Sequence, residues 1–217
     1  VDKLDNFISE ALKKNVDKIL TNSKSKISNE KVYRFEDYEK VFEDILYNIN
    51  PAYKEKIYFG ITGTNGKTTT AYLLNSLLGD SSIFVGTIDE DNLFQFTNEE
   101  HLTTPKLFNL VKMLSLVDKN IKNVVLEVSS HALTQKRLNG LLFKMSGFTN
   151  LSQDHLDYHN TMDEYFEAKS KLFNKNTSED FAYIVSKYGE RLNEICNFRG
   201  ISIGNTENNK VQLNAYS

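Results

Sequence analysis

The chain has 217 residues, 40% of them hydrophobic and 25% charged, which is enough apolar material to bury a core in one or two globular domains. Its formal charge of −3 argues against a protein that grips nucleic acid through a basic surface, although a small anionic ligand needs only a few local donors. The single cysteine excludes an internal disulfide framework and a cysteine-rich zinc site. Because no apolar run reaches membrane-spanning length and the first residues do not form a secretory signal, the sequence predicts a cytoplasmic protein without a membrane partner.

Residues 1–54 are predicted to be the carboxyl-terminal part of a larger domain, because they are too few to form a stable hydrophobic core of their own. The predicted elements are a helix over residues 5–14, strands over 17–21 and 32–35, and a helix over 38–46. Asp5 is available to cap the first helix. A polar stretch around Pro51 separates these elements from the first strongly apolar strand and marks the domain boundary.

Residues 55–217 contain short apolar strands that alternate with helices. Strands are predicted over residues 57–61, 82–88, 123–128, 145–151 and 181–185, and helices over 66–78, 105–116 and 162–173. This alternation predicts an α/β fold, a mostly parallel sheet with helices on both faces. Ligands of such sheets bind at the carboxyl ends of the strands, so polar residues that follow a strand are the candidates for a functional site.

A glycine-rich segment, TGTNGKTTT (residues 62–70), lies between the first of these strands and a helix. Glycines allow the backbone to wrap a phosphate, and the helix start presents unpaired N–H groups. Lys67 can reach the terminal phosphates of ATP, and the Thr68 hydroxyl can bind the accompanying Mg²⁺. The strict pattern would have glycine where the chain has Ile61, and the alternative is an ordinary turn with a solvated lysine. The position between strand and helix favours the phosphate loop.

All four histidines lie in polar segments between residues 101 and 159. The first segment, HLTTP (residues 101–105), precedes a predicted helix that Pro105 opens. Thr103 and Thr104 can contact an anion or a carbonyl group, but threonines in this position also cap helices. The residues alone favour capping.

The second segment, LEVSSHAL (residues 126–133), ends a predicted buried strand. A carboxylate there is costly unless it is paired, so Glu127 either binds a divalent metal or forms a salt bridge with a loop lysine. A phosphate loop in the same sheet favours the metal.

The third segment, TNLSQDHLDYH (residues 149–159), follows another strand and leads into a helix that contains Lys169. Lys169 lies three residues after Phe166 and four before Phe173, so it points inward, where an unpaired ammonium is costly. Either the aliphatic part of the side chain runs along the core and carries the amine to solvent, or the buried amine has a functional role through a partner or a covalent modification.

The chain resembles the Mur ligase family in a series of motifs, which are GTNGKTTT, TTP, EVSSHALTQKR, FTNLSQDHLDYH and YFEAKSKLF, in this order. The sequences of two of these motifs, SSHAL and DHLDYH, are similar to those of the MurE type of the family. The resemblance covers nearly the whole chain. It implies that residues 1–54 close an amino-terminal UDP-binding domain and that residues 55–217 form part of the central ATP-binding domain.

The resemblance also implies a role for each matching residue. The phosphates of ATP would be bound by Gly63, Thr64, Asn65, Gly66, Lys67, Thr68 and Thr69. Two Mg²⁺ ions would be held by Thr68, Glu127, His155 and Lys169, the lysine as a carbamate formed with carbon dioxide. The UDP-muramoyl peptide would be contacted by Thr103, Thr104, Ser129, Gln135 and Arg137. Lys67, His155 and Lys169 would be the catalytic residues.

The implied activity is ATP-dependent formation of an amide bond in peptidoglycan synthesis. A cytoplasmic monomer that needs no nucleic acid would add the third amino acid to UDP-N-acetylmuramoyl-L-alanyl-D-glutamate through an acyl phosphate. Lys106 departs from the family pattern, in which an acidic residue is frequent at this position. Because the sequence stops before the expected carboxyl-terminal domain, this chain alone is predicted to be inactive, and the identity of the amino acid stays open.

Two alternatives remain. One is another ligase on the same scaffold, such as a folylpolyglutamate or cyanophycin-synthetase-like enzyme, against which the DHLDYH and EVSSHAL motifs argue. The other is a nucleotide-binding module without catalysis.

Overall fold

The computed structural model describes residues 3–14, 16–89, 93–96, 102–154, 158–198, 200–205 and 209–212. Its contacts divide the chain into two compact units, Val1–Pro51 and Ala52–Ser217. The assignment of the first unit to a UDP-binding domain stays a prediction.

The described residues of the first unit form two helices and two strands. They are α1 (Lys3–Lys13), β1 (Ile19–Asn22), β2 (Val32–Phe35) and α2 (Tyr38–Ile49), with β1 and β2 paired in parallel. The expected capping role of Asp5 is wrong, because this residue lies inside the first turn of α1. Its carboxylate instead accepts a hydrogen bond from the Ser25 hydroxyl at 2.9 Å. Asp37 is the cap of α2 and accepts a hydrogen bond from the backbone N–H of Lys40 at 3.0 Å.

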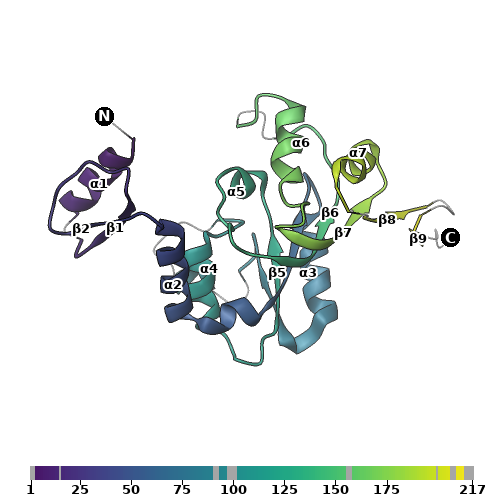
Figure 1. The fold of residues 1–217 in the computed structure, drawn as a ribbon. Coiled ribbons are helices and arrows are strands. Elements are labelled where there is room, and N and C mark those ends of the chain that lie inside the picture. Colours follow the sequence, from purple (N-terminus) through teal and green to yellow (C-terminus); the bar gives the residue numbers. More distant parts are fainter. Residues whose placement is uncertain are drawn as a thin grey trace. The chain divides into compact units, whose positions relative to one another are not determined.

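In the described residues, the second unit is built on a seven-stranded sheet in the order β4-β5-β3-β6-β7-β8-β9. Figure 1 shows the side of this sheet that ends in β6, β7, β8 and β9. The strands are β3 (Ile57–Thr62), β4 (Ser82–Val85), β5 (Asn123–Glu127), β6 (Phe143–Phe148), β7 (Ser178–Ile184), β8 (Ile201–Gly204) and β9 (Val211–Gln212). Each neighbouring pair is parallel, which confirms the predicted fold class.

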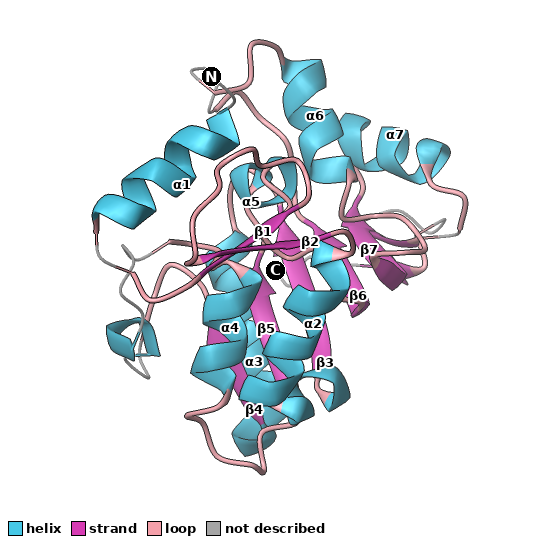
Figure 2. Cartoon of the chain, turned by 60° about the vertical axis from the view of Figure 1, so that its left-hand side comes forward, coloured by secondary structure: helices cyan, strands magenta, loops and turns pink. Residues whose placement is uncertain are grey.

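Helices connect these strands (Figure 2). They are α3 (Lys67–Leu78), α4 (Leu107–Leu114), α5 (Ser130–Thr134), α6 (Met162–Ser170) and α7 (Lys187–Ile195), with short 3₁₀ turns at Pro51–Glu55, Gly79–Ser81 and Leu93–Phe96. None of the described helices has the length and apolar character that crossing a membrane requires.

Both faces of the sheet are covered at its centre. On one face, Val125 packs in a cluster with Ala71 of α3. Val124 and Leu126 alternate with Val125 and point to the opposite face, yet their exposure is also 0%. Strands buried on both faces explain why β5 is a continuous apolar run rather than an alternating pattern.

The helix predicted over residues 105–116 is shorter in the structure. Its cap position is Lys106, so Pro105 precedes the helix instead of opening it, and the helix ends at Leu114. The predicted strand over residues 82–88 likewise ends at Val85.

The strand order sets the position of the candidate site. Strand β3 lies between β5 and β6, so the segments that follow these three strands meet at one edge of the sheet. The glycine-rich loop follows β3, Glu127 ends β5, and the TNLSQD segment follows β6.

Candidate active site

The glycine-rich loop joins β3 to α3 in a conformation that needs its glycines. Gly63 and Gly66 have φ angles of 152° and 80°, a region that other residues rarely adopt. At Gly63 an added Cβ atom would lie 1.9 Å from the Thr149 hydroxyl oxygen. Thr64 is buried, and Thr69 is exposed in the first turn of α3. The loop therefore presents the start of α3 in the arrangement predicted for binding phosphates.

The segment after β6 clasps this loop. The backbone N–H of Thr64 donates to the Asn150 carbonyl at 2.9 Å, and that of Asn65 donates to the Asn150 side-chain oxygen at 3.0 Å. The Thr149 hydroxyl donates to the Asn65 carbonyl at 2.7 Å, and the Ser152 N–H donates to the Thr64 hydroxyl oxygen at 3.0 Å. These hydrogen bonds from the segment after β6 stabilise the conformation of the glycine-rich loop.

The amine of Lys67 folds back over the loop. It donates hydrogen bonds to the carbonyl oxygens of Gly63 at 3.1 Å and Thr64 at 2.8 Å. Burial lowers its pKa, while the negative charges of Glu127 and Asp154 act in the opposite direction.

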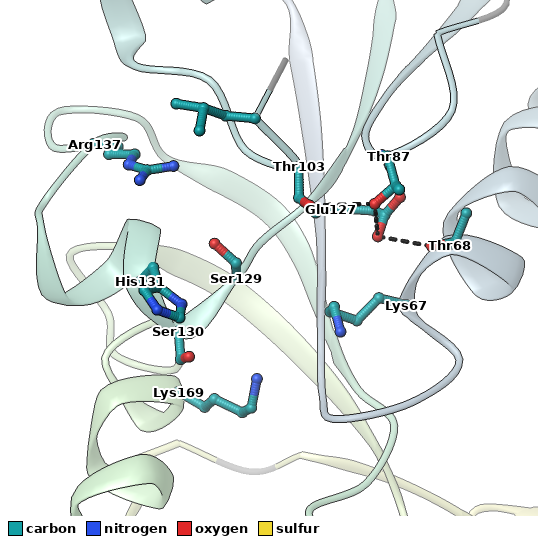
Figure 3. A pocket seen from close by; sticks show the side chains of 11 residues that line it. Lys67, Thr68, Thr87, Thr103, Glu127, Ser129, Ser130, His131, Arg137 and Lys169 are labelled. Atoms are coloured by element: carbon teal, nitrogen blue, oxygen red, sulfur yellow. Dashed lines mark hydrogen bonds between the residues drawn. The ribbon is translucent and has the colours of Figure 1, made fainter. Parts of the chain in front are cut away.

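The carboxylate of Glu127 is completely buried beside the start of α3 (Figure 3). It accepts hydrogen bonds from the Thr68 hydroxyl at 2.9 Å and from the backbone N–H of Thr87 at 2.8 Å. A hydroxyl and a backbone amide therefore satisfy this carboxylate, rather than the lysine salt bridge of the alternative interpretation.

The donors near Glu127 fit Mg²⁺. Among the described residues, no three His, Cys, Asp or Glu side chains gather into a metal-binding group. Mg²⁺ does not need such a group, because it typically takes one or two carboxylates, water and phosphate oxygens. The Glu127 carboxylate and the Thr68 hydroxyl, next to a phosphate loop, offer that set of hard oxygen donors.

Lys169 points inward, as its helical position predicts, and only 2% of it is exposed. Its amine does not extend to solvent: it donates a hydrogen bond to the Gly63 carbonyl at 2.8 Å and lies 4.5 Å from the centre of the Tyr165 ring. Burial, followed by repulsion from Lys67, lowers the pKa of Lys169 to about 7, against a smaller opposing effect of Asp154. Lys67 and Lys169 thus donate to the same carbonyl oxygen.

Thr104 and Ser129 connect the segments after β5 and before α4. The Thr104 hydroxyl donates to the Glu127 carbonyl at 2.8 Å and accepts from the Ser129 N–H at 3.0 Å. The capping interpretation is wrong, since the cap of α4 is Lys106 and no side chain caps that helix. Ser129 itself caps α5 by accepting a hydrogen bond from the Ala132 N–H.

Arg137 is held at the edge of the same region. Its guanidinium donates to the Thr104 carbonyl at 2.9 Å and to the Gln135 side-chain oxygen at 2.9 Å. Gln135 is exposed and accepts this hydrogen bond from Arg137, and its contact with the UDP-muramoyl substrate stays a prediction. His101 and His155 lie outside the described residues, so the metal-binding role of His155 stays a prediction.

A cavity of about 340 Å³ brings most of these side chains together (Figure 3). Its lining consists of Lys67, Thr68, Thr87, Leu102, Thr103, Glu127, Ser129, Ser130, His131, Arg137 and Lys169. Thr104 and Gln135 do not line the cavity but form hydrogen bonds with residues that do: Thr104 with the Glu127 carbonyl and Gln135 with Arg137. The cavity has a carboxylate and hydroxyls at one end and three cationic side chains around it, an arrangement suited to an anionic ligand with a bound cation.

Comparison with known proteins identifies the family. The model for the Mur ligase middle domain matches residues 61–216. The chain belongs to the Mur ligase family. This match confirms the family that the sequence motifs predict.

Several Mur ligases are similar to this chain. The UDP-N-acetylmuramoyl-L-alanyl-D-glutamate–2,6-diaminopimelate ligase 1 of Clostridium acetobutylicum is 40% identical over 215 residues, which cover 96% of this chain and 44% of that protein. The corresponding ligase of Fusobacterium nucleatum is 44% identical over 149 residues, covering 65% of this chain and 30% of that protein. This chain therefore spans less than half the length of these relatives.

Solved Mur ligase structures share the fold. A UDP-N-acetylmuramoyl-L-alanyl-D-glutamate–2,6-diaminopimelate ligase matches with a TM-score of 0.65 and 24% identity, over 86% of this chain and 40% of that one. A MurF ligase from Thermotoga maritima in complex with ADP matches with a TM-score of 0.54 and 16% identity, over 92% of this chain and 44% of that one.

In this Mur ligase chain, sequence analysis missed the roles of Thr87, Asn150 and Tyr165. Thr87 reaches the Glu127 carboxylate from the segment after β4, and Asn150 binds the phosphate loop. Asn150 lies in the polar TNLSQDHLDYH segment at the end of a predicted strand, which is the signal that could have identified it. The other two contacts depend on which strands and helices become neighbours.

Proposed function

We propose that this chain is the nucleotide-binding part of a ligase that adds the third amino acid to UDP-N-acetylmuramoyl-L-alanyl-D-glutamate in peptidoglycan synthesis. The observation that carries this proposal is the buried Glu127 carboxylate, hydrogen-bonded to Thr68 at the start of the helix that follows the phosphate loop. The names of the relatives support the substrate, and they favour 2,6-diaminopimelate as the added amino acid. The monomeric state and the cytoplasmic location stay predictions.

In the proposed reaction, the N–H groups at the start of α3 and the amine of Lys67 bind the phosphates of ATP, and Thr68 and Glu127 would hold Mg²⁺. The γ-carboxylate of the substrate's D-glutamate attacks the γ-phosphorus, and the bond to the β-phosphate oxygen breaks, giving an acyl phosphate and ADP. The amine of the amino acid then attacks the acyl carbon, loses a proton and displaces phosphate, which leaves an amide. Bound Mg²⁺ would neutralise charge on the transferring phosphoryl group, and Lys67 adds a fixed positive charge for the same purpose.

We further propose that Lys169 acts as a carbamate. Its neutral amine would add to carbon dioxide, forming a C–N bond and releasing a proton. The product carries a negative charge, so the repulsion between Lys169 and Lys67 over the Gly63 carbonyl would become an attraction. The carbamate would support a second Mg²⁺ together with His155. The burial of Lys169 and its pKa of about 7 support this assignment, because a neutral amine is the reactive form.

Replacing Arg137 by alanine should weaken binding of the UDP-muramoyl peptide more than binding of ATP. Arg137 lines the cavity away from the phosphate loop, and its guanidinium can bind a phosphate or a carboxylate through paired hydrogen bonds. We expect the KM for the muramoyl substrate to rise on the order of tenfold, given the usual strength of charged hydrogen bonds. The matched control is Gln135→Ala, which removes a side chain that contacts Arg137 but does not line the cavity, and it should have a smaller effect. An unchanged KM for the muramoyl substrate would show that Arg137 does not bind this substrate.

The proposal is tested by coupling ATP consumption to the substrate. A complete ligase can be made by placing this chain in the matching region of the Clostridium acetobutylicum enzyme, to which it is 40% identical. We expect ADP formation only when UDP-N-acetylmuramoyl-L-alanyl-D-glutamate is present, and amide product only when diaminopimelate is added. Nucleotide binding by a folded chimera without any substrate-dependent ADP formation would favour the nucleotide-binding module instead.

A further inference from the structure

His159 is a buried histidine to which the proposed reaction assigns no task. It precedes α6, and only 4% of it is exposed. Its Nε2 atom lies 2.9 Å from the hydroxyl oxygen of Ser130, which is itself buried in the first turn of α5. Helices α5 and α6 lie beside each other (Figure 1), so this hydrogen bond joins the segment after β5 to the segment that leads into α6.

The imidazole ring of His159 also supports the Tyr165 ring. The two ring centres are 5.1 Å apart at an angle of 33°, and Tyr165 is completely buried. The His159 ring also lies nearly perpendicular to the Tyr158 ring, at an angle of 83° and with ring centres 4.9 Å apart. The His159 ring therefore restrains the Tyr165 ring by packing against it. The hydrogen bond to Ser130 restrains the His159 imidazole in turn.

Tyr165 touches both catalytic elements of the proposed site. Its ring face lies 4.5 Å from the Lys169 amine, a cation–π distance. Its hydroxyl oxygen lies 3.4 Å from the Thr64 hydroxyl, which donates to it from the phosphate loop. A continuous series of contacts thus runs from Ser130 through His159 and Tyr165 to Lys169 and the phosphate loop.

We infer that His159 is a positioning residue, which holds the Tyr165 ring so that Lys169 stays against the Gly63 carbonyl. His159 is absent from the lining of the cavity, whereas Ser130 and Lys169 are part of it, so it acts through other residues rather than on a ligand. The catalytic meaning of this inference rests on the proposed function, but the positioning itself is measurable without ligation.

The test compares the chemical accessibility of Lys169 in variants of this chain. The protein is treated with an amine-reactive reagent over a series of pH values, so that the labelling rate of each lysine can be corrected for the fraction of its amine that is neutral. These rates are measured by mass spectrometry, with the exposed Lys171 as internal reference. In His159→Ala the Ser130 hydroxyl loses its imidazole partner and space opens beside Tyr165, so the ring no longer holds the amine. We expect labelling of Lys169 relative to Lys171 to rise on the order of tenfold, the scale of a desolvated cation–π contact.

A conservative variant should restore protection. The glutamine side chain in His159→Gln can reach Ser130 and lie flat against the Tyr165 ring, so most of the protection of Lys169 should return. Should His159→Ala fail to fold, His159→Phe offers the same test, because it keeps a ring and loses the bond to Ser130. It is expected to raise the labelling rate by a smaller factor.

The control for general loosening is Ser146→Ala, which removes a buried hydroxyl contact of 2.6 Å to Ser178 between β6 and β7. This variant should lower the melting temperature without exposing Lys169. Wild-type labelling of Lys169 in folded His159→Ala, or an equal increase in Ser146→Ala, would overturn the inference. Mg·ATP binding by the unmodified chain is measured in parallel: its absence would contradict the proposed function and leave the labelling result to decide the role of His159.

Discussion

Replacing Lys67 by alanine should abolish ATP-dependent chemistry while leaving the fold intact. The Lys67 amine is the positive group at the phosphate loop, bound to the carbonyl oxygens of Gly63 and Thr64. Without this amine, no positive charge from Lys67 stabilises the negative charge that develops on the phosphoryl group during its transfer. We expect Mg·ATP binding to this chain to weaken on the order of 10²-fold, near the upper end for a charged hydrogen bond, and substrate-dependent ADP formation to fall below detection in the complete ligase.

Two measurements make the Lys67 prediction specific. The melting temperature of Lys67→Ala should stay close to that of the wild type, because the half-buried lysine contributes little packing. The matched control is Lys171→Ala, which removes an exposed lysine and should leave nucleotide binding unchanged. Near-normal ADP formation by folded Lys67→Ala would remove the phosphate-loop assignment.

Replacing Lys169 by alanine should nearly eliminate ligation in the complete enzyme. The proposed carbamate places a negative group beside Lys67 and the cation site, and alanine offers neither the charge nor the oxygen ligands. Added formate or acetate should partly restore activity by occupying the vacated space. Lys169→Arg should not be restored, since a guanidinium would repel the cation and Lys67. A metal-bound structure of the complete enzyme with an unmodified Lys169 pointing to solvent would contradict the assignment.

The pH dependence of carbamate formation follows from the lowered pKa of Lys169. With a pKa of about 7, the amine is an unreactive ammonium at lower pH and becomes neutral as the pH rises through 7. A ¹³C NMR signal from ¹³C-bicarbonate should therefore grow through this range and be absent in Lys169→Ala. A lysine with its ordinary pKa would stay almost fully protonated there.

In Lys67→Ala the repulsion from Lys67 is gone, so the pKa of Lys169 should rise and the signal should appear at higher pH.

The sequence by itself determined the class of fold and the position of the phosphate loop. Apolar strands separated by helices are local patterns, and the glycines, Lys67 and Thr68 lie within one short segment whose conformation depends mainly on neighbouring residues. The inward direction of Lys169 also followed from helical spacing alone. Helix α5 was missed because its five residues are too few to show a period.

Only the tertiary structure decided which partners these side chains have. The Lys169 amine and the Gly63 carbonyl are 106 positions apart in sequence, and the loop and its clasp at Asn150 are 85 apart. Thr104, which the residues favoured as a helix cap, instead binds the backbone at the end of β5, 23 positions away. Such contacts follow from the strand order β5-β3-β6, which brings the carboxyl ends of three strands together. Local propensity contains no information about that order, because it is fixed by the packing of the whole sheet.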